Sequence, residues 1–357
     1  MRIALLSYST KPRGGVVHTL ALAEALAAAG QDVTVWTLGR GGDTGFYRPV
    51  DPAVRLRVVP FPDRPGEGVG ERVLRSIATL REAFDAGPYD IVHAQDCISA
   101  NAVPHCVRTV HHIDHFTTPE LAACHERAIV TPYAHICVSA AVAAELAEGW
   151  GIKATVIPNG VAYDRFATTD PAARARRRDR LGRYVLTVGG IEPRKGSLDL
   201  LEAYALLRAR HPDVRLVIAG GETLFDYRDY RARWEARAAE LGVEPIVLGP
   251  VPDDDLPPLV AAADVFAFPS VKEGFGLAAM EALAAGVPVV VRDLPVFREI
   301  FSPAARFAAT PYDFATELAA ALTGDDPVRR REGRALAARH TWQAAAERHL
   351  AFYRSLR

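Results

Sequence analysis

The sequence has no apolar stretch of about 18 residues, the minimum length for a helix that spans a membrane. Residues 1–8 contain an apolar run too short for a signal peptide, and this run predicts a first β-strand instead. The four cysteines include no C-x-x-C pair, and nothing else indicates secretion. The formal net charge of −1 gives no electrostatic reason to expect nucleic acid or an anionic substrate. These absences favour a cytoplasmic protein that binds no nucleic acid.

Two common patterns of ligand-binding residues are missing as well. The first predicted strand is not followed by G-x-G-x-x-G, which argues against a nicotinamide-dependent oxidoreductase. No H-E-x-x-H or closely spaced cysteine pair supports a metal site, although cysteine and histidine are concentrated in one region. Its members are Cys97, Cys106, Cys124, Cys137, His93, His105, His111, His112, His115, His125 and His135. A metal site remains an alternative to small core cysteines, but we expect no metal.

The 357 residues suffice for two domains of about 100–200 residues each. Residues 2–7 predict a strand, 9–15 a glycine-rich loop, 16–29 a helix and 31–37 a second strand. This β-loop-α-β order is typical of an α/β fold that binds phosphate at its first loop, with a plain tight turn as the alternative.

The same order returns in the second half of the chain. Residues 184–188 predict a strand and 189–196 its loop, and Ser197 is placed to cap the helix that follows. Arg194 and Lys195 lie in this loop, so it is a second candidate for phosphate binding.

A third strand-loop-helix segment, residues 265–300, carries two carboxylates eight positions apart, Glu273 and Glu281. On a continuous helix this spacing is about 12 Å, beyond the roughly 5–9.5 Å of paired glycosidase carboxylates. The two side chains are therefore expected to hold different parts of an extended ligand. The glycines Gly274 and Gly276, before a helix predicted at 277–285, suit close approach of a phosphate or sugar hydroxyls. The alternative is an exposed helix with two solvated acids.

The segment E-G-F-G-L-A-A-M-E, within P-S-x-x-E-G-F-G and E-A-x-A-x-G-x-P-V-V, resembles the E-x7-E signature of the retaining family-4 glycosyltransferases. P-R-G-G-V, T-V-H-H-I-D, P-N-G-V and G-G-I-E-P-R-K-G resemble further family motifs, in order along the chain. The resemblance implies the GT-B fold, an α/β architecture with two Rossmann-like domains facing a central cleft. Residues 1–165 would form the acceptor domain, 166–182 a linker and 183–341 the donor domain. A last helix, 342–357, would cross back to the first domain.

The resemblance also implies roles for individual residues. His111 and Glu273 are expected to be catalytic and to contact the donor sugar, although a core histidine is the alternative for His111. Glu281 would bind the ribose, and Lys195 matches the family lysine that clamps the diphosphate. The family arginine is replaced by Gly190, so we expect Arg194 to take its place; the alternative is that Arg194 points to solvent and pairs with Glu192.

The other residues implied by the resemblance fall into two groups. Those expected to bind the donor are Gly14, Gly15, Gly190, Val251, Gly274, Phe275, Gly276 and Leu277. Those expected on the acceptor side are His112, Asp114 and His115.

The resemblance implies retaining transfer of a hexose from a nucleotide diphosphate sugar, without metal or cofactor. The acceptor is undefined: a small molecule, a glycan or a lipid. A catalytically impaired nucleotide-sugar-binding protein is the alternative, because Gly190 departs from the family. The arginines between residues 172 and 182 would either contact an anionic membrane surface or form the solvated face of a linker helix.

Overall fold

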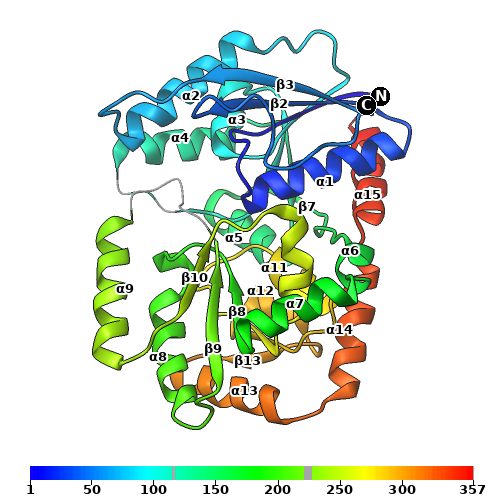
Figure 1. The fold of residues 1–357 in the computed structure, drawn as a ribbon. Helices are drawn as coiled ribbons and strands as arrows, with labels where there is room; N and C mark the ends of the chain where they lie inside the picture. The colour runs from blue at the N-terminus through cyan, green and yellow to red at the C-terminus, as the bar shows by residue number, and fades with distance from the viewer. Residues whose placement is uncertain (115, 117, 221–226, 357) are drawn as a thin grey trace. The chain divides into compact units, whose positions relative to one another are not determined.

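The computed structural model describes residues 1–114, 116, 118–220 and 227–356, which form two α/β units (Figure 1). Unit 1 consists of Met1–Gly160 and Trp342–Arg357, and unit 2 of Val161–Thr341. The sheet order is β3-β2-β1-β4-β5-β6-β7 in unit 1 and β10-β9-β8-β11-β12-β13 in unit 2. Both orders reverse beside the first strand of the unit, as in doubly wound nucleotide-binding folds. The predicted α/β class with two Rossmann-like domains is confirmed.

The sheet of unit 1 is built from short apolar runs that pair in parallel. Its strands are β1 (Arg2–Leu6), β2 (Asp32–Arg40), β3 (Val54–Phe61), β4 (Ile91–Ala94), β5 (Val107–Val110), β6 (Ala134–Cys137) and β7 (Thr155–Val156). Every residue of β4 and β5 is buried, as expected for inner strands of a parallel sheet. The edge strand β3 was not predicted, because its exposed positions interrupt the apolar run.

The helices of unit 1 are α1 (Gly14–Ala28), α2 (Val69–Ala83), α3 (Cys97–Ala102), α4 (Pro119–Val130), α5 (Ala140–Trp150) and α15 (Trp342–Ser355). Helix α1 begins at the Gly-Gly pair and not at residue 16, so these two glycines form its first turn. Helix α15 packs against α1 (Figure 1), which places the last helix in unit 1 as predicted. One hydrophobic core of unit 1 lies between the sheet and α2, α3 and α4.

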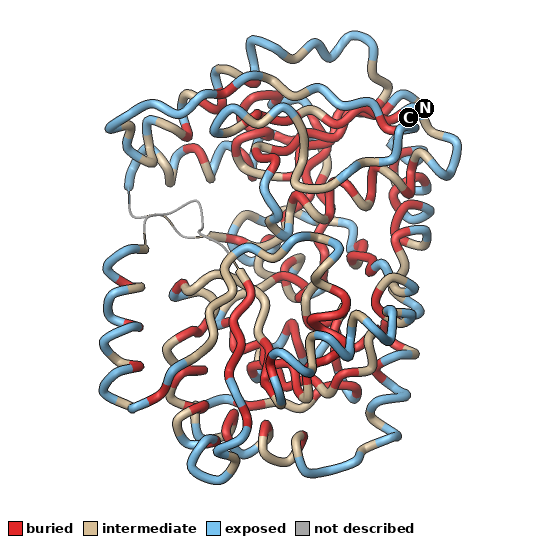
Figure 2. Tube along the Cα trace, in the orientation of Figure 1, coloured by how far each residue is buried: buried red, intermediate tan, exposed pale blue. Residues whose placement is uncertain are grey.

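The strands of unit 2 are β8 (Arg183–Val188), β9 (Val214–Ala219), β10 (Ile246–Gly249), β11 (Val265–Phe268), β12 (Val289–Arg292) and β13 (Arg306–Ala308). Its α-helices are α6 (Tyr163–Ala167), α7 (Pro171–Leu181), α8 (Ser197–Arg208), α9 (Arg228–Leu241), α10 (Leu256–Ala261), α11 (Leu277–Ala284), α12 (Pro295–Phe301), α13 (Pro311–Thr323) and α14 (Pro327–Arg339). Figure 2 shows the inner strands buried, whereas the outward face of α9 is exposed. The helix predicted at 277–285 is confirmed as α11.

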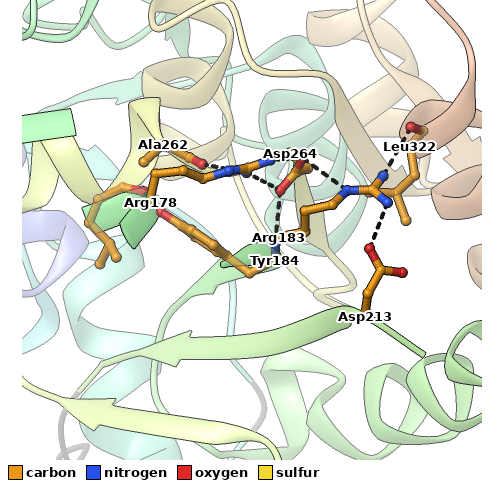
Figure 3. A network of polar contacts seen from close by, with 8 residues as sticks. Arg178, Arg183, Tyr184, Asp213, Ala262, Asp264 and Leu322 are labelled. Carbon is orange, nitrogen blue, oxygen red and sulfur yellow. Dashed lines mark hydrogen bonds and ion pairs between the residues drawn. The ribbon is translucent and has the colours of Figure 1, made fainter. Parts of the chain in front are cut away.

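The division between the units falls after Gly160, so residues 166–182, predicted as a linker, lie in unit 2. They include the whole of α7, whose Arg178 reaches Asp264 through two guanidinium contacts, one of them 2.9 Å long (Figure 3). Asp264 also accepts a hydrogen bond from the Tyr184 backbone N–H at 2.8 Å. The Arg177 guanidinium pairs with Asp255 at 2.5 Å. Two of the clustered arginines therefore hold α7 to unit 2.

Among the described residues, no helix combines the length and the apolar character that a membrane crossing needs.

Candidate active site

Two loops of unit 2 meet because the strands that precede them are neighbours. β8 and β11 pair in parallel, so the loop after Val188 and the loop after Phe268 lie at the same edge of the sheet. The carboxyl edge of a parallel sheet, where the strand order reverses, is where α/β folds bind ligands. The predicted Gly190, Lys195 and Glu273 all lie in these two loops.

Glu273 is the centre of an ionic cluster. Its Oε1 atom accepts hydrogen bonds from Lys195 Nζ at 2.5 Å and from Arg194 Nη1 at 2.9 Å. Arg194 also donates to Glu192 Oε1 at 3.2 Å and to the Lys272 carbonyl at 3.2 Å. Arg194 therefore pairs with Glu192, as the alternative prediction had it, but it does not point only to solvent, because it also bonds Glu273. Two cations and two carboxylates converge where a diphosphate is expected.

Two glycines fix the shape of these loops. Gly196 has φ 63°, and a Cβ atom there would lie 2.2 Å from the Pro269 carbonyl oxygen, so the two loops touch at this point. Gly276 has φ 102° and forms the N-cap of α11, where a Cβ atom would meet Phe301 and Phe268 at 3.0–3.1 Å. Only glycine fits either position.

A small hollow lies between the loops, lined by residues that include Gly190, Lys195, Phe268 and Ser270. The Lys195 ammonium is 5.3 Å from the centre of the Phe268 ring. The Ser270 hydroxyl is buried and, within the described part of the chain, has no hydrogen-bond partner. An unpaired buried hydroxyl beside a lysine suits a ligand oxygen. Ser270 was not among the predicted site residues, and its place directly after β11 was the available signal.

Glu281 lies in the second turn of α11, in an environment distinct from that of Glu273. Burial raises the pKa of Glu281 to about 8, with Arg165 opposing the rise and Asp253 adding to it. Arg165 is held by Asp253 at 2.7 Å, and both belong to unit 2. The carboxyl of Glu281 therefore lies among polar groups that the sequence did not single out. The two glutamates have different partners, which fits binding of different parts of one ligand.

The remaining donor-binding candidates of unit 2 differ in how far they are exposed. Phe275 is buried, with its ring 5.9 Å from that of His340, so its side chain belongs to the core. Gly274 is buried before α11, whereas Leu277 is the first residue of that helix and partly exposed. Val251 is partly exposed in the loop after β10. None of these four side chains carries a hydrogen-bonding group, so only their backbone N–H and C=O groups are able to bond a ligand.

In unit 1, His111 directly follows β5, and α1 lies beside it. A Cβ atom on Gly15 would be 3.9 Å from His111 Cδ2 and Nε2, so the first turn of α1, which includes Gly14, borders the imidazole. The surrounding protein desolvates the ring, which lowers the pKa of His111 well below its ordinary value, and Arg108 lowers it further. His111 is therefore neutral. Its Nε2 atom is buried without a hydrogen-bond partner in the described residues.

The acceptor-side candidates lie in the segment after His111. His112 Nε2 is 3.2 Å from Asp114 Oδ2, and both side chains are partly exposed. His115 is outside the described residues.

The cysteine- and histidine-rich region shows no sign of metal binding in the part of the chain that the structure describes. No three side chains of the ligating types gather as a metal site there, and the four cysteines are free thiols. Burial raises the pKa of Cys97 to about 11 and that of Cys106 and Cys137 to about 12, which suits packing of neutral thiols.

The two doubly wound units and the ionic loop of the second define the GT-B class of nucleotide-sugar enzymes. Residues 12–165 match the family described as Glycosyltransferase Family 4, and residues 173–335 match Glycosyl transferases group 1. The chain belongs to the family-4 glycosyltransferases, and it is a glycosyltransferase with the GT-B fold.

Named relatives agree with this assignment. A phosphatidyl-myo-inositol mannosyltransferase of Mycolicibacterium smegmatis is 31% identical over 359 residues, 92% of this chain and 86% of the relative. A D-inositol 3-phosphate glycosyltransferase of Pseudarthrobacter chlorophenolicus is 31% identical over 333 residues, 81% and 78% of the two chains. HepE of Anabaena, solved in complex with UDP-glucose, has a TM-score of 0.77 at 20% identity and covers 99% of this chain and 100% of its own.

Proposed function

We propose that this glycosyltransferase moves a hexose from a nucleotide diphosphate sugar to a hydroxyl acceptor with retention of anomeric configuration and without a metal ion. The observation that carries the proposal is the cluster of Lys195, Arg194 and Glu273 at the strand ends of unit 2. Lys195 and Arg194 would neutralise the diphosphate, which needs fixed positive charge where no divalent ion is used. The N-terminus of α11 adds N–H groups that suit an anion.

The chemistry requires no protein nucleophile. The bond between the anomeric carbon and the phosphate oxygen breaks, and the acceptor hydroxyl attacks on the same face of the sugar. Its proton passes to the departing phosphate oxygen, so the leaving group acts as the base. Neutral His111 would donate or accept a hydrogen bond at the sugar, and Glu273 would bind sugar hydroxyls, both as catalytic residues.

An acceptor that contains inositol is the class that we propose. Two of the relatives act, by their names, on phosphatidyl-myo-inositol and on D-inositol 3-phosphate. His112 and Asp114 offer a donor and an acceptor for polyol hydroxyls in unit 1.

A panel of nucleotide diphosphate sugars, screened first by thermal shift and then by transfer to inositol 3-phosphate or to phosphatidylinositol vesicles, tests the proposal. We expect one donor to raise Tm by mass action and to give product that keeps the anomeric configuration, with EDTA having no effect. Loss of transfer in EDTA that zinc restores would overturn the metal-independent mechanism. A donor that binds without turnover or hydrolysis would support the alternative, a nucleotide-sugar-binding protein impaired by Gly190.

Glu273→Gln provides a matched variant, because it keeps the shape of the side chain and removes its charge. We expect transfer to fall about 10²-fold, as for loss of a group that acts in the transition state. Affinity for the nucleoside diphosphate should be unchanged or higher, because Glu273 bonds Lys195 and removal of its charge leaves the lysine more available to the diphosphate. Weaker diphosphate binding by this variant would contradict the sugar-side role of Glu273.

A further inference from the structure

His18, in the second turn of α1, has no part in the function proposed above, yet it lies against His111. The two imidazoles have ring centres 4.7 Å apart and planes inclined at 78°. His18 is 1% exposed, so this contact lies inside unit 1. In this edge-to-face arrangement, rotation of the His111 ring would break its contact with His18, so the contact restricts that rotation.

Asn159, far away in the sequence, determines which ring nitrogen of His18 carries the proton. His18 Nδ1 is 2.9 Å from Asn159 Oδ1, across 141 positions of sequence and in a buried environment. An amide oxygen only accepts hydrogen bonds, so Nδ1 carries the proton. Burial lowers the pKa of His18 well below its ordinary value, and the neighbouring His111 and His349 lower it further. His18 is therefore neutral. Its Nε2 carries a lone pair that accepts no hydrogen bond from the described residues.

The same ring touches both segments through which the chain passes between the units. Asn159 is the next-to-last residue of the first segment of unit 1, and Trp342 is the first residue of the second segment. The rings of His18 and Trp342 are 5.4 Å apart with planes at 77°. Movement of either segment thus changes the contacts of His18 within unit 1.

We propose that His18 is a positioning residue, which fixes the orientation of His111 and ties it to Asn159 and Trp342. The contact with His18 holds the His111 ring in the orientation in which Nε2 has no partner among the described residues and is left to bond a ligand oxygen. The Asn159 hydrogen bond keeps His18 in the Nδ1–H form, and contact between the two imidazoles disfavours a charge on either. The part of this inference that concerns catalysis rests on the function proposed above.

Substitutions of the two linked residues test the catalytic part. For His18→Phe and Asn159→Leu, we expect kcat of transfer to fall at least about tenfold, because displacement of a reacting group by a fraction of an ångström is costly. The donor KM should change by less than about twofold, because His18 does not bind the donor. The double variant should be no worse than His18→Phe, since both substitutions break one link.

His349→Phe is the matched control. His349 is buried to the same 1% and lies 6.2 Å from His18, but its Nδ1 bonds the Ala345 carbonyl within α15. Its kcat should equal that of the wild-type enzyme when each variant is assayed below its own Tm. Equal kcat losses in His18→Phe and His349→Phe would reduce His18 to a packing residue and overturn the proposal.

Nitrogen-15 NMR of the histidine rings gives a second readout that needs no substrate. We expect the Nδ1–H pattern for His18 in the wild-type protein and in His349→Phe. In Asn159→Leu, that pattern should be lost and the His111 ring signals should shift. An Nε2–H pattern for wild-type His18, or unchanged His111 signals in Asn159→Leu, would overturn the positioning role. If no donor supports transfer, the proposed function fails, and this NMR result still decides the inference.

Discussion

The raised pKa of the Glu281 carboxyl makes the candidate donor site sensitive to pH near neutrality. Its pKa is raised to about 8, and a carboxylate that accepts bonds from ribose hydroxyls must be ionised. We therefore expect the association constant for the nucleoside diphosphate to rise roughly tenfold between about pH 6.5 and 8. Calorimetry of the wild-type protein and Glu281→Gln across this range measures the effect. The glutamine variant also reports any contribution from titration of the phosphate.

Stability should respond to the same group with the opposite sign. Between the ordinary value of 4.5 and about 8, the folded protein keeps the proton of Glu281 and the unfolded chain has released it. The free energy of unfolding of the wild-type protein should thus fall relative to Glu281→Gln as the pH rises through that window.

The ribose assignment of Glu281 would be contradicted if the nucleotide affinities of the wild-type protein and Glu281→Gln changed with pH in the same way.

Arg194 and Gly190 allow a test of charge compensation at the diphosphate. Gly190 lines the hollow beside Lys195, and Arg194 reaches Glu273 from the same loop. We expect Arg194→Ala and Lys195→Ala each to reduce transfer at least about 10²-fold. Addition of Gly190→Arg should partly restore Arg194→Ala, because it returns a guanidinium to the family position. Wild-type transfer by Arg194→Ala would show that Lys195 and the start of α11 suffice.

For individual residues of the site, the sequence predicted which residues are candidates better than it predicted the contacts that they make. The motifs placed Lys195 and Glu273 in loops that the strand order then brought together. They gave no indication that Glu273 would bind both cations at once, because that contact joins residues 78 and 79 positions apart. His18 was missed since a single histidine inside an apolar helix pattern looks like a core residue, and its link to Asn159 depends on tertiary packing.

Among the secondary-structure elements, α7 carries both arginines that pair with the rest of unit 2 and arginines that are exposed. Arg178 forms a bidentate pair with Asp264, which is 16% exposed, whereas Arg176 lies 3.9 Å from Asp170 with both side chains exposed. We expect Arg178→Ala to lower the free energy of unfolding of unit 2 by about 1–2 kcal/mol, because Asp264 loses a charged partner. Arg176→Ala should change it by less than about 0.5 kcal/mol. Denaturant titration measures both, and equal effects would contradict a stabilising role of the Arg178–Asp264 pair shown in Figure 3.

The elements that the sequence predicted are those with a clear period and a clear end. α11 has an apolar pattern closed by glycine and proline, and its start and end were predicted within one residue. α9 was not predicted, because its arginines and glutamates interrupt the apolar positions and only three of its residues are buried. α6 and α10 are too short for a helical period to appear.

For the whole molecule, the motif order predicted two domains and the return of the last helix to the first. The boundary differed, because P-N-G-V ends unit 1 at Gly160 and the residues that follow pack on unit 2. Val161 donates a backbone hydrogen bond to His340 at 2.7 Å, which joins the start and end of unit 2. A pairing across 179 positions leaves no local signal in the sequence.

The discontinuous make-up of unit 1 leads to a prediction about its folding. Helix α15 buries Trp342, Leu350 and Tyr353, and the Tyr353 hydroxyl lies 2.6 Å from His93 Nδ1. Burial of three such side chains contributes roughly 5–9 kcal/mol at about 1.5–3 kcal/mol each, comparable to the whole stability of a domain. Removal of residues 342–357 should therefore abolish cooperative unfolding of unit 1. Unit 2, which is continuous, should keep its own transition and its affinity for the nucleoside diphosphate, measured by calorimetry. Tyr353→Phe provides the graded control, because it removes one hydrogen bond and should cost only about 1 kcal/mol. A truncated protein in which both units still unfold cooperatively would mean that unit 1 is stable without α15.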